Sequence, residues 1–251
     1  KNILYIGATG YLGKKISIDL ASCGANLIIN GTNNNKLKKL KKEIDLINPC
    51  EIAKFDVSNV QEIKKFSKNY GKKPINCVIN SANIPYEENI LTVNNTNYIN
   101  TFNLSVLAAQ NIFKYLYQNL KLSVKQTDDS SFINISSVYS MFSPVIEMYS
   151  NKPNPPSYGA AKAALNQWTR YAACQFAKEK IRFNTISPGA FPNTKNIKDK
   201  KLIKSLKSKI PVGKFGSPED LSGIIIYLAS NSSKYCTGSN IIIDGGWSSQ
   251  I

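Results

Sequence analysis

Histidine is absent from this chain of 251 residues, and so is any long apolar run. Without histidine the chain cannot build a Ser-His-Asp triad or the common histidine-based zinc sites of hydrolases. No apolar run approaches the roughly 20 residues that cross a bilayer. The first residues form the apolar strand pattern Ile3-Leu4-Tyr5-Ile6, without the features of a secretion signal. We therefore expect no metal site and no membrane contact, and a cytoplasmic location.

Cysteine is scarce and scattered. No two of the five cysteines have the close spacing of a zinc site or a redox pair. An odd number of widely separated thiols is typical of a reduced, cytosolic protein. The five are Cys23, Cys50, Cys77, Cys174 and Cys236.

Arginine is nearly absent, although the chain is strongly basic. The net charge is +16, yet Arg170 and Arg182 are the only arginines and every other positive side chain is lysine. Base recognition and phosphate clamps favour arginine because of its planar fork. The lysines are spread over many segments instead of forming one patch. We expect no nucleic-acid partner, and a positive field that attracts phosphorylated cofactors and anionic substrates.

The chain does contain a regular alternation of strand-like and helix-like hydrophobic patterns. Repeated strand–helix units predict parallel strands joined by right-handed crossovers. Strands such as Leu27-Ile28-Ile29 are apolar without alternation, which is typical of a parallel sheet buried on both faces. We expect a single α/β domain over residues 1–251, a Rossmann-like doubly wound parallel sheet of about seven strands with helices on both faces. The expected strands are 2–6, 25–30, 52–55, 75–80, 131–136, 182–187 and 240–243, and the expected helices are 11–22, 36–47, 59–69, 97–119, 157–179 and 217–230.

A glycine-rich segment joins the first expected strand to the first helix. It reads Gly7-Ala8-Thr9-Gly10-Tyr11-Leu12-Gly13. Glycines at such a turn let the backbone approach a pyrophosphate, which then rests on the N-terminus of the helix. The segment therefore predicts a dinucleotide site, and a glycine-rich surface turn is the alternative.

The end of the second strand bears on the choice between NAD and NADP. An acidic residue there would bind the ribose 2′-hydroxyl of NAD, but the strand ends in Asn30-Gly31-Thr32-Asn33 with Lys36 close behind. The missing carboxylate favours NADP over NAD. Asp56, followed by Val57 after the third strand, could bind the adenine amino group or could cap a turn or helix.

Tyr158 and Lys162 are four residues apart in an expected helix. At this spacing two side chains share one face, about 5–6 Å apart at Cβ, and an ammonium beside a phenol favours the phenolate. Such a tyrosine could exchange a proton with a substrate oxygen, although an exposed helix pair has the same spacing. Ser137 ends the fifth strand, where a hydroxyl could hold the substrate oxygen. Asn97 begins the long helix, where it could hold a water that links Lys162 to solvent.

In this order along nearly the whole chain, these motifs resemble the short-chain dehydrogenase/reductase family. The resemblance implies a nicotinamide-dependent oxidoreductase with the tetrad Asn97, Ser137, Tyr158 and Lys162. Tyr158 would be the general acid/base, Ser137 would orient the substrate, Lys162 would bind the nicotinamide ribose, and Asn97 would complete the proton relay. The implied cofactor contacts are Gly7, Thr9, Gly10, Tyr11, Leu12, Gly13, Gly31, Thr32, Asn33, Asp56, Val57, Asn80, Ser81, Ala82, Tyr158, Lys162, Pro188 and Gly189.

Some features depart from the family pattern. The glycine spacing around Tyr11 is more similar to that of nucleotide-sugar epimerases and dehydratases, and a threonine expected after Gly189 is displaced to Thr194. The segment from Ser137 to Tyr158 is long, so we expect substrate loops at about 141–156 and 190–212.

The long segment and the C-terminal Asp-Gly-Gly-Trp motif are similar to those of surface-glycan and flagellin-glycan enzymes and of sugar and polyol oxidoreductases. We expect a small-molecule substrate, a polar and sugar-like alcohol or ketone. The alternatives are a 3-oxoacyl thioester reductase, an epimerase or dehydratase, and a non-catalytic dinucleotide-binding protein. The resemblance also implies a homo-oligomer, either a tetramer or a dimer.

Overall fold

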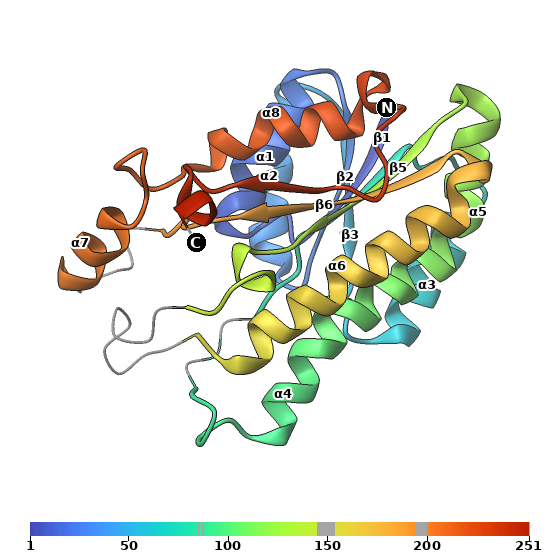
Figure 1. Cartoon of the computed structure of the whole chain (residues 1–251). Helices are drawn as coiled ribbons and strands as arrows, with labels where there is room; N and C mark the ends of the chain where they lie inside the picture. Colours follow the sequence, from blue (N-terminus) through green and yellow to red (C-terminus); the bar gives the residue numbers. More distant parts are fainter. Residues whose placement is uncertain (85, 87, 145–153, 194–199, 251) are drawn as a thin grey trace.

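A single parallel sheet of seven strands organises the molecule (Figure 1). The computed structural model describes residues 1–84, 86, 88–144, 154–193 and 200–250. The strand order is β3-β2-β1-β4-β5-β6-β7, so the chain reverses direction across the sheet between β1 and β4. This confirms the predicted doubly wound α/β fold. The strands are β1 Asn2–Ile6, β2 Asn26–Gly31, β3 Cys50–Lys54, β4 Cys77–Asn80, β5 Ser130–Ile135, β6 Ile181–Pro188 and β7 Asn240–Ile243.

Helices cover both faces of the sheet, each over its own apolar cluster (Figure 1). On one face Leu20, Leu37 and Ile225 pack against the strands. On the other face Ile63 and Leu165 do the same. No helix of the described ranges is long and apolar enough to span a membrane. The first face carries α1 Tyr11–Ser22, α2 Asn34–Asp45 and α8 Pro218–Ala229, and the second α3 Val60–Tyr70, α5 Ala108–Thr127 and α6 Pro156–Phe176.

The helix expected at 97–119 differs from the prediction in two ways. It begins as α4, Asn95–Phe102, passes through a π-helical segment at Asn103–Leu107, and continues as α5 to Thr127. The α5 portion is longer than expected because Leu120 and Val124, four residues apart, extend its apolar face onto the sheet.

One helix was not predicted at all. Helix α7, Lys200–Ser208, lies inside the segment expected as a substrate loop. Leu202 and Leu206, four residues apart, are the side chains of this helix that pack into an apolar cluster. A single turn-to-turn pair of this kind is too short a pattern to separate a helix from a loop.

Polar side chains inside the core fix the position of α6. Asn80 on β4 donates from Nδ2 to Oδ1 of Asn134 on β5 over 3.0 Å. Asn134 in turn donates to the Oγ1 of Thr169 on α6, also over 3.0 Å. All three residues are buried. Because buried polar groups are costly without partners, this chain of bonds allows one position of α6 over β4 and β5.

A buried ion pair lies at the amino ends of β5 and β6. Arg182 on β6 donates to both carboxylate oxygens of Asp129, over 2.7 and 3.1 Å, and also to the carbonyl of Leu228 over 3.0 Å. The two charged side chains are 5% and 3% exposed. The guanidinium therefore depends on Asp129 to balance its charge away from water.

We predict that Asp129→Asn lowers the free energy of unfolding by about 3–5 kcal/mol, because it leaves a buried charge uncompensated. The matched control is Glu43→Gln, which removes the partner of Lys14 in a pair 2.8 Å long at the surface. That change should cost less than about 1 kcal/mol. Urea unfolding of the three proteins measures both values, and equal costs for the two substitutions would contradict the assignment.

Candidate active site

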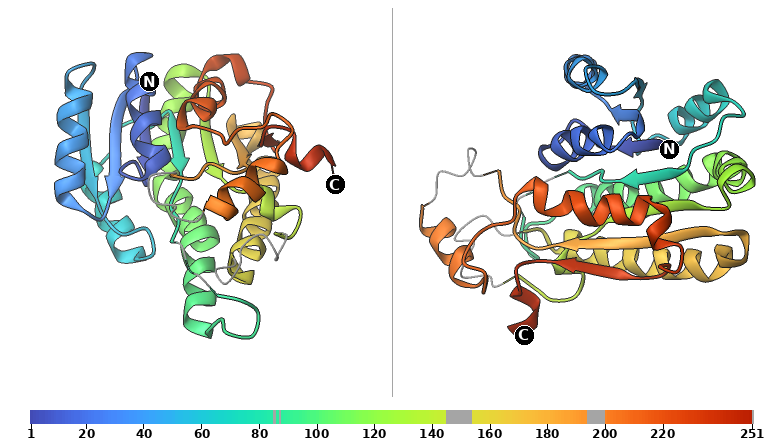
Figure 2. Two further views of the ribbon diagram at one scale, coloured as in Figure 1. Left: turned by 90° about the vertical axis from the view of Figure 1, so that its left-hand side faces the viewer. Right: turned by 90° about the horizontal axis from the view of Figure 1, so that it is seen from above.

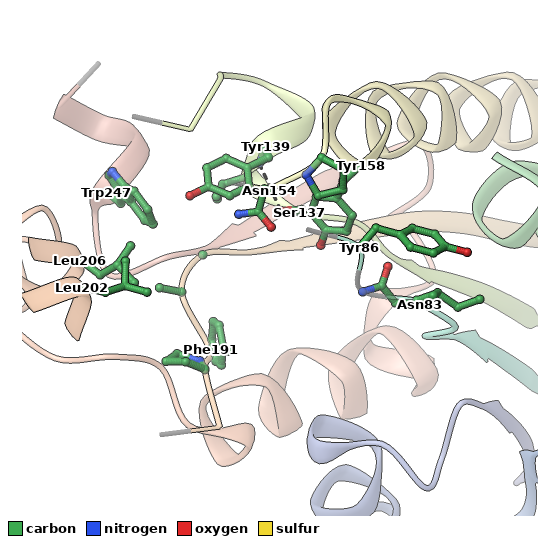
Figure 3. A pocket seen from close by; sticks show the side chains of 16 residues that line it. Asn83, Tyr86, Ser137, Tyr139, Asn154, Tyr158, Phe191, Leu202, Leu206 and Trp247 are labelled. Carbon is green, nitrogen blue, oxygen red and sulfur yellow. Dashed lines mark hydrogen bonds between the residues drawn. The ribbon is translucent and has the colours of Figure 1, made fainter. Parts of the chain in front are cut away.

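The connections that follow the strands gather at the carboxyl edge of the sheet (Figure 2). A cleft of about 330 Å³ opens there. Ser137 and Tyr158 both line it, and Phe191 faces them from across the cleft (Figure 3). In doubly wound folds ligands bind at this edge, where the strand order reverses. The cleft is therefore the candidate site.

Lys162 lies behind Tyr158 and is almost fully buried. Its side chain is 3% exposed, and Nζ donates to the carbonyl of Ile135, at the end of β5, over 2.9 Å. Nζ is 5.7 Å from the centre of the Tyr158 ring. Burial in the core lowers the pKa of Lys162 to about 8, because desolvation penalises the charged form. The helix thus brings the predicted pair together at the cleft, with the tyrosine on the lining and the lysine beneath it.

Ser137 is placed by the turn that follows β5. It precedes a short 3-10 turn, Val138–Ser140, and its Oγ accepts a hydrogen bond from the Tyr139 amide over 3.2 Å. A hydroxyl that accepts from the backbone still has its own proton to donate. Because Ser137 is on the same cleft as Tyr158, two O–H groups can face one substrate oxygen.

Asn97 lies in the first turn of α4, and its side chain bonds the loop before that helix. Its Nδ2 donates to Oε1 of Glu88 over 2.7 Å, and its backbone N–H is capped by the side chain of Asn94. Among the described residues, no hydrogen bond joins Asn97 to Lys162 or Tyr158. The structure therefore brings Ser137, Tyr158 and Lys162 together, and leaves the predicted relay role of Asn97 without a contact that supports it.

Asn103 is a second candidate, and it was not among the residues expected from the sequence. It begins the π-helical segment that packs against α6, and its carbonyl accepts from the amide of Ala108, five residues on. Single π-helical turns within α-helices often occur at functional sites. The available signal was a polar residue within the apolar run Phe102-Asn103-Leu104, but an insertion in the helical repeat cannot be seen from periodicity.

The glycine-rich turn between β1 and α1 forms a backbone cradle. A Cβ on Gly7, whose φ is +77°, would lie 2.9 Å from the carbonyl oxygen of Ser81. A Cβ on Gly13 would lie 2.5 Å from the Gly7 carbonyl oxygen, so α1 packs directly on the turn. Helix α1 starts after Gly10 with no side chain capping its first amides. These uncapped N–H groups and the dipole of the helix suit a pyrophosphate, so the residues present fit a dinucleotide.

The rest of this turn points toward the second strand. Gly31 ends β2, and a Cβ there would lie 3.0 Å from Oγ1 of Thr9. Tyr11 is 44% exposed, and Leu12 packs on the core beneath the turn. Thr32 follows Gly31. Asn33 caps α2 by accepting from the Lys36 amide over 3.0 Å. The described residues at this position include no carboxylate.

The third and fourth strands end nearby. Oδ1 of Asp56 accepts hydrogen bonds from both the amide and the hydroxyl of Ser58, over 2.8 and 2.7 Å. That oxygen therefore stabilises the turn that follows β3. Val57 is buried in the core. Asn80 belongs to the core network, whereas Ser81 and Ala82 lie against Gly7.

The sixth strand completes the edge. Pro188 is the last residue of β6, beside Ile243 on β7. Gly189 follows it, lines the cleft, and packs so closely on Asp244 that a Cβ would lie 2.7 Å from the Asp244 Cβ.

Both expected substrate loops reach the cleft in their described parts. Asn154 and Pro155 line it from the 141–156 segment, and Phe191, Leu202 and Leu206 line it from 190–212. Residues 145–153 and 194–199, including Thr194, lie outside the described ranges. Within those ranges no cluster of three or more His, Cys, Asp or Glu side chains could hold a metal ion.

Comparisons with known proteins identify the relatives of this chain. A family model described as enoyl-(acyl carrier protein) reductase matches residues 7–248. The chain is 29% identical to the 3-oxoacyl-(acyl-carrier-protein) reductase FabG of Thermotoga maritima, over 98% of this chain and 97% of that protein. It is 28% identical to the 2-dehydro-3-deoxy-D-gluconate 5-dehydrogenase of Dickeya dadantii, over 98% and 95%.

A solved structure shows the same fold. It is a gluconate 5-dehydrogenase from Burkholderia cenocepacia, in complex with NADP and tartrate. The TM-score is 0.89 at 22% identity, over 100% of this chain and 96% of that chain.

Removing the buried ammonium should change how stability depends on pH. The native pKa of Lys162, about 8, lies below the ordinary value of 10.5, so the native state releases this proton first as the pH rises. The unfolded state then binds more protons, and this group adds stability between about pH 8 and 10.5. We predict that Lys162→Met lacks that rise, which is on the order of 2–3 kcal/mol.

The measurement is urea unfolding of both proteins at several pH values from 7 to 10.5. Lys64→Met, the same substitution on the exposed side of α3, controls for the loss of a surface charge. Parallel pH curves for wild type and Lys162→Met would show that the lysine is solvated, contrary to the structure.

Proposed function

This chain belongs to the short-chain dehydrogenase/reductase family, and on that premise we propose that it moves hydride between a nicotinamide cofactor and a polar, sugar-like alcohol or ketone. The chain is a nicotinamide-dependent oxidoreductase of that family. The observation that carries the proposal is the arrangement of Ser137 and Tyr158 on one cleft with buried Lys162 behind the tyrosine.

The positions of these side chains support the following roles. When bound, the nicotinamide ring supplies or accepts the hydride, which is chemistry that no side chain here can perform. In the reducing direction Tyr158 gives its phenolic proton to the substrate oxygen while the carbonyl carbon gains the hydride. Ser137 donates a hydrogen bond to the same oxygen and holds it in place. In the oxidising direction each transfer is reversed.

Lys162 supports the tyrosine from beneath. Its ammonium is held between the Ile135 carbonyl and the Tyr158 ring, and a positive charge there stabilises a phenolate. Its three N–H donors allow a further bond to the cofactor ribose. Because its pKa is lowered to about 8 by burial, Lys162 can also exchange a proton near neutral pH.

We propose NADP as the preferred cofactor, with NAD as the alternative. The cradle of Gly7, Gly10 and Gly13 would bind the pyrophosphate. Thr32 and Asn33 present no carboxylate to repel a 2′-phosphate, and the exposed Lys36 lies in the first turn of α2. The N-terminus of that helix adds a favourable dipole for an anion. The Asp56 carboxylate retains a second oxygen that could bind the adenine amino group.

Two substrate classes are candidates, a polyhydroxylated compound and a 3-oxoacyl thioester. The relatives named as sugar-acid dehydrogenases favour a polyhydroxylated substrate. The relative named as a 3-oxoacyl reductase favours a thioester, and the apolar side chains of Leu202 and Leu206 on the cleft would suit an acyl chain. The amides of Asn83 and Asn154 on the same cleft favour the polyhydroxylated class.

We also propose a homo-oligomer, either a dimer or a tetramer, in the cytoplasm. The apolar residues Ile99, Leu107 and Tyr171 are 57%, 51% and 67% exposed on the helices of one face. Exposed apolar side chains on neighbouring helices suit a contact with a second copy. The scattered free thiols suit a reducing compartment.

We predict that Tyr158→Phe lowers turnover by about 10²–10⁴-fold, because it removes the general acid/base, and leaves NADPH binding within about twofold. Absorbance at 340 nm measures turnover with candidate sugars, and fluorescence titration measures binding. The control is Tyr235→Phe, the same change at a fully exposed tyrosine outside the proposed contact between copies. Full turnover by Tyr158→Phe would refute the catalytic role.

The two asparagine candidates can be separated directly. We predict that Asn103→Ala lowers kcat by at least about tenfold, or 1.4 kcal/mol in the barrier, because Asn103 lies at the helix irregularity that packs on α6. Asn97→Ala should have a smaller effect, since its amide bonds Glu88. Steady-state kinetics of both variants at saturating cofactor is the test. A larger loss of kcat in Asn97→Ala than in Asn103→Ala would contradict this prediction and support Asn97 as the relay residue.

A further inference from the structure

The two ends of the cleft differ in chemistry, and this difference bears on the substrate. Ser137 and Tyr158 lie midway along it (Figure 3). Beyond them, at one end, the side chains of Leu202, Leu206 and Trp247 gather (Figure 3). A substrate whose reacting oxygen lies at Tyr158 can therefore extend its far end onto an apolar surface.

The apolar end is a packed structure. Trp247 is 4% exposed and Leu206 is 6% exposed, and together with Ile210 they form a small core of their own. The ring centre of Trp247 lies 6.1 Å from the ring centre of Tyr139, in an edge contact. It lies 5.9 Å from the ring centre of Phe142, in a tilted contact. Aromatic rings packed against one another have little freedom to rearrange when a polar ligand group approaches. The surface therefore offers a fixed apolar contact.

No described residue of the cleft lining carries a formal charge. This holds although the chain has a net charge of +16 and 32 lysine and arginine side chains. A carboxylate placed against Leu202, Leu206 and Trp247 would lose water without gaining a partner there, which is costly.

A polar group stands beside the reacting position. Asn154 and Ser137 line the same cleft, and in the view of Figure 3 the Asn154 amide lies between the apolar end and Tyr158. It is half-buried, and within the described ranges it has no hydrogen-bond partner. An amide both donates and accepts, so Asn154 can bind a hydroxyl on a carbon near the reacting one.

We infer that the substrate is a neutral polyhydroxylated compound whose end remote from the reacting carbon is a methyl or similar apolar group, as in a 6-deoxyhexose, and is not a sugar acid. Leu202, Leu206 and Trp247 select the apolar end, and Asn154 positions the hydroxyl near the reacting carbon. The inference rests on the proposed function and names its substrate class.

Three sugars that differ at C6 alone test this selectivity. D-fucose, D-galactose and D-galacturonate carry a methyl, a hydroxymethyl and a carboxylate there, and L-rhamnose, L-mannose and L-mannuronate form a second set. We expect kcat/KM with NADP to be at least about tenfold higher for the 6-deoxy sugar than for the hexose. We expect it to be at least about a hundredfold higher for the 6-deoxy sugar than for the uronate.

The variant Leu202→Lys places an ammonium at the apolar end, where Leu202 is half-buried. It should raise kcat/KM for the uronate relative to the 6-deoxy sugar by at least about tenfold. Leu46→Lys makes the same substitution at a site that is 89% exposed, at the end of α2, and should leave the ratio unchanged. A ratio that does not change in Leu202→Lys contradicts the inference.

Binding separates this inference from the proposed chemistry. Tryptophan fluorescence of the protein with bound NADPH reports sugar binding without turnover. The expected order of affinity, with no turnover of any sugar, would contradict the proposed reaction and support the selectivity. Uronate binding or turnover equal to or better than that of the 6-deoxy sugar would overturn the inference, and so would absence of binding in both sets.

Discussion

The hydrogen bond from the Lys162 ammonium to the carbonyl of Ile135 is the contact on which the geometry of the site depends. It joins the second turn of α6 to the end of β5 inside the core. Ser136 reinforces it by donating to the Lys162 carbonyl, and the bond from Asn134 to Thr169 fixes the same helix two turns farther along. Once α6 is held there, its first turn reaches the carboxyl edge of the sheet, and Tyr158 lies on the same cleft as the hydroxyl that follows β5. The site is a consequence of how one helix is anchored.

Local sequence patterns were enough to predict most of the fold and part of the candidate site. Apolar strands and the right-handed crossover rule leave few alternatives for the order of seven parallel strands, and a four-residue spacing on one helix is enough to pair Tyr158 with Lys162. The π-helical turn at Asn103 could not be predicted, because its extra residue is stabilised by packing against α6. Helix α7 could not be predicted because its apolar side comprises two leucines whose partner, Trp247, comes from the end of the chain. Both misses depend on contacts between distant segments.

The positive field of the protein and the lining of the cleft act on different ligands, the cofactor and the substrate. Lysines spread over the surface raise the potential everywhere and favour the approach of a phosphorylated cofactor. The described cleft lining is uncharged, so we propose that shape, amide groups and the apolar end at Trp247 select among substrates. From the sequence, we expected the field to attract anionic substrates as well. The cleft favours a division in which the cofactor carries the negative charge and the substrate is neutral.

Cofactor binding is tested most directly by titrating the wild-type protein with NADPH and, separately, with NADH, and following tryptophan and nicotinamide fluorescence. We expect saturable binding of both at a single site, with NADPH bound more tightly because no carboxylate follows Gly31 at the end of β2. Tighter binding of NADH would contradict the cofactor preference. Absence of saturable binding of either would show that the turn from Gly7 to Gly13 does not hold a dinucleotide, and would contradict the proposed chemistry as a whole.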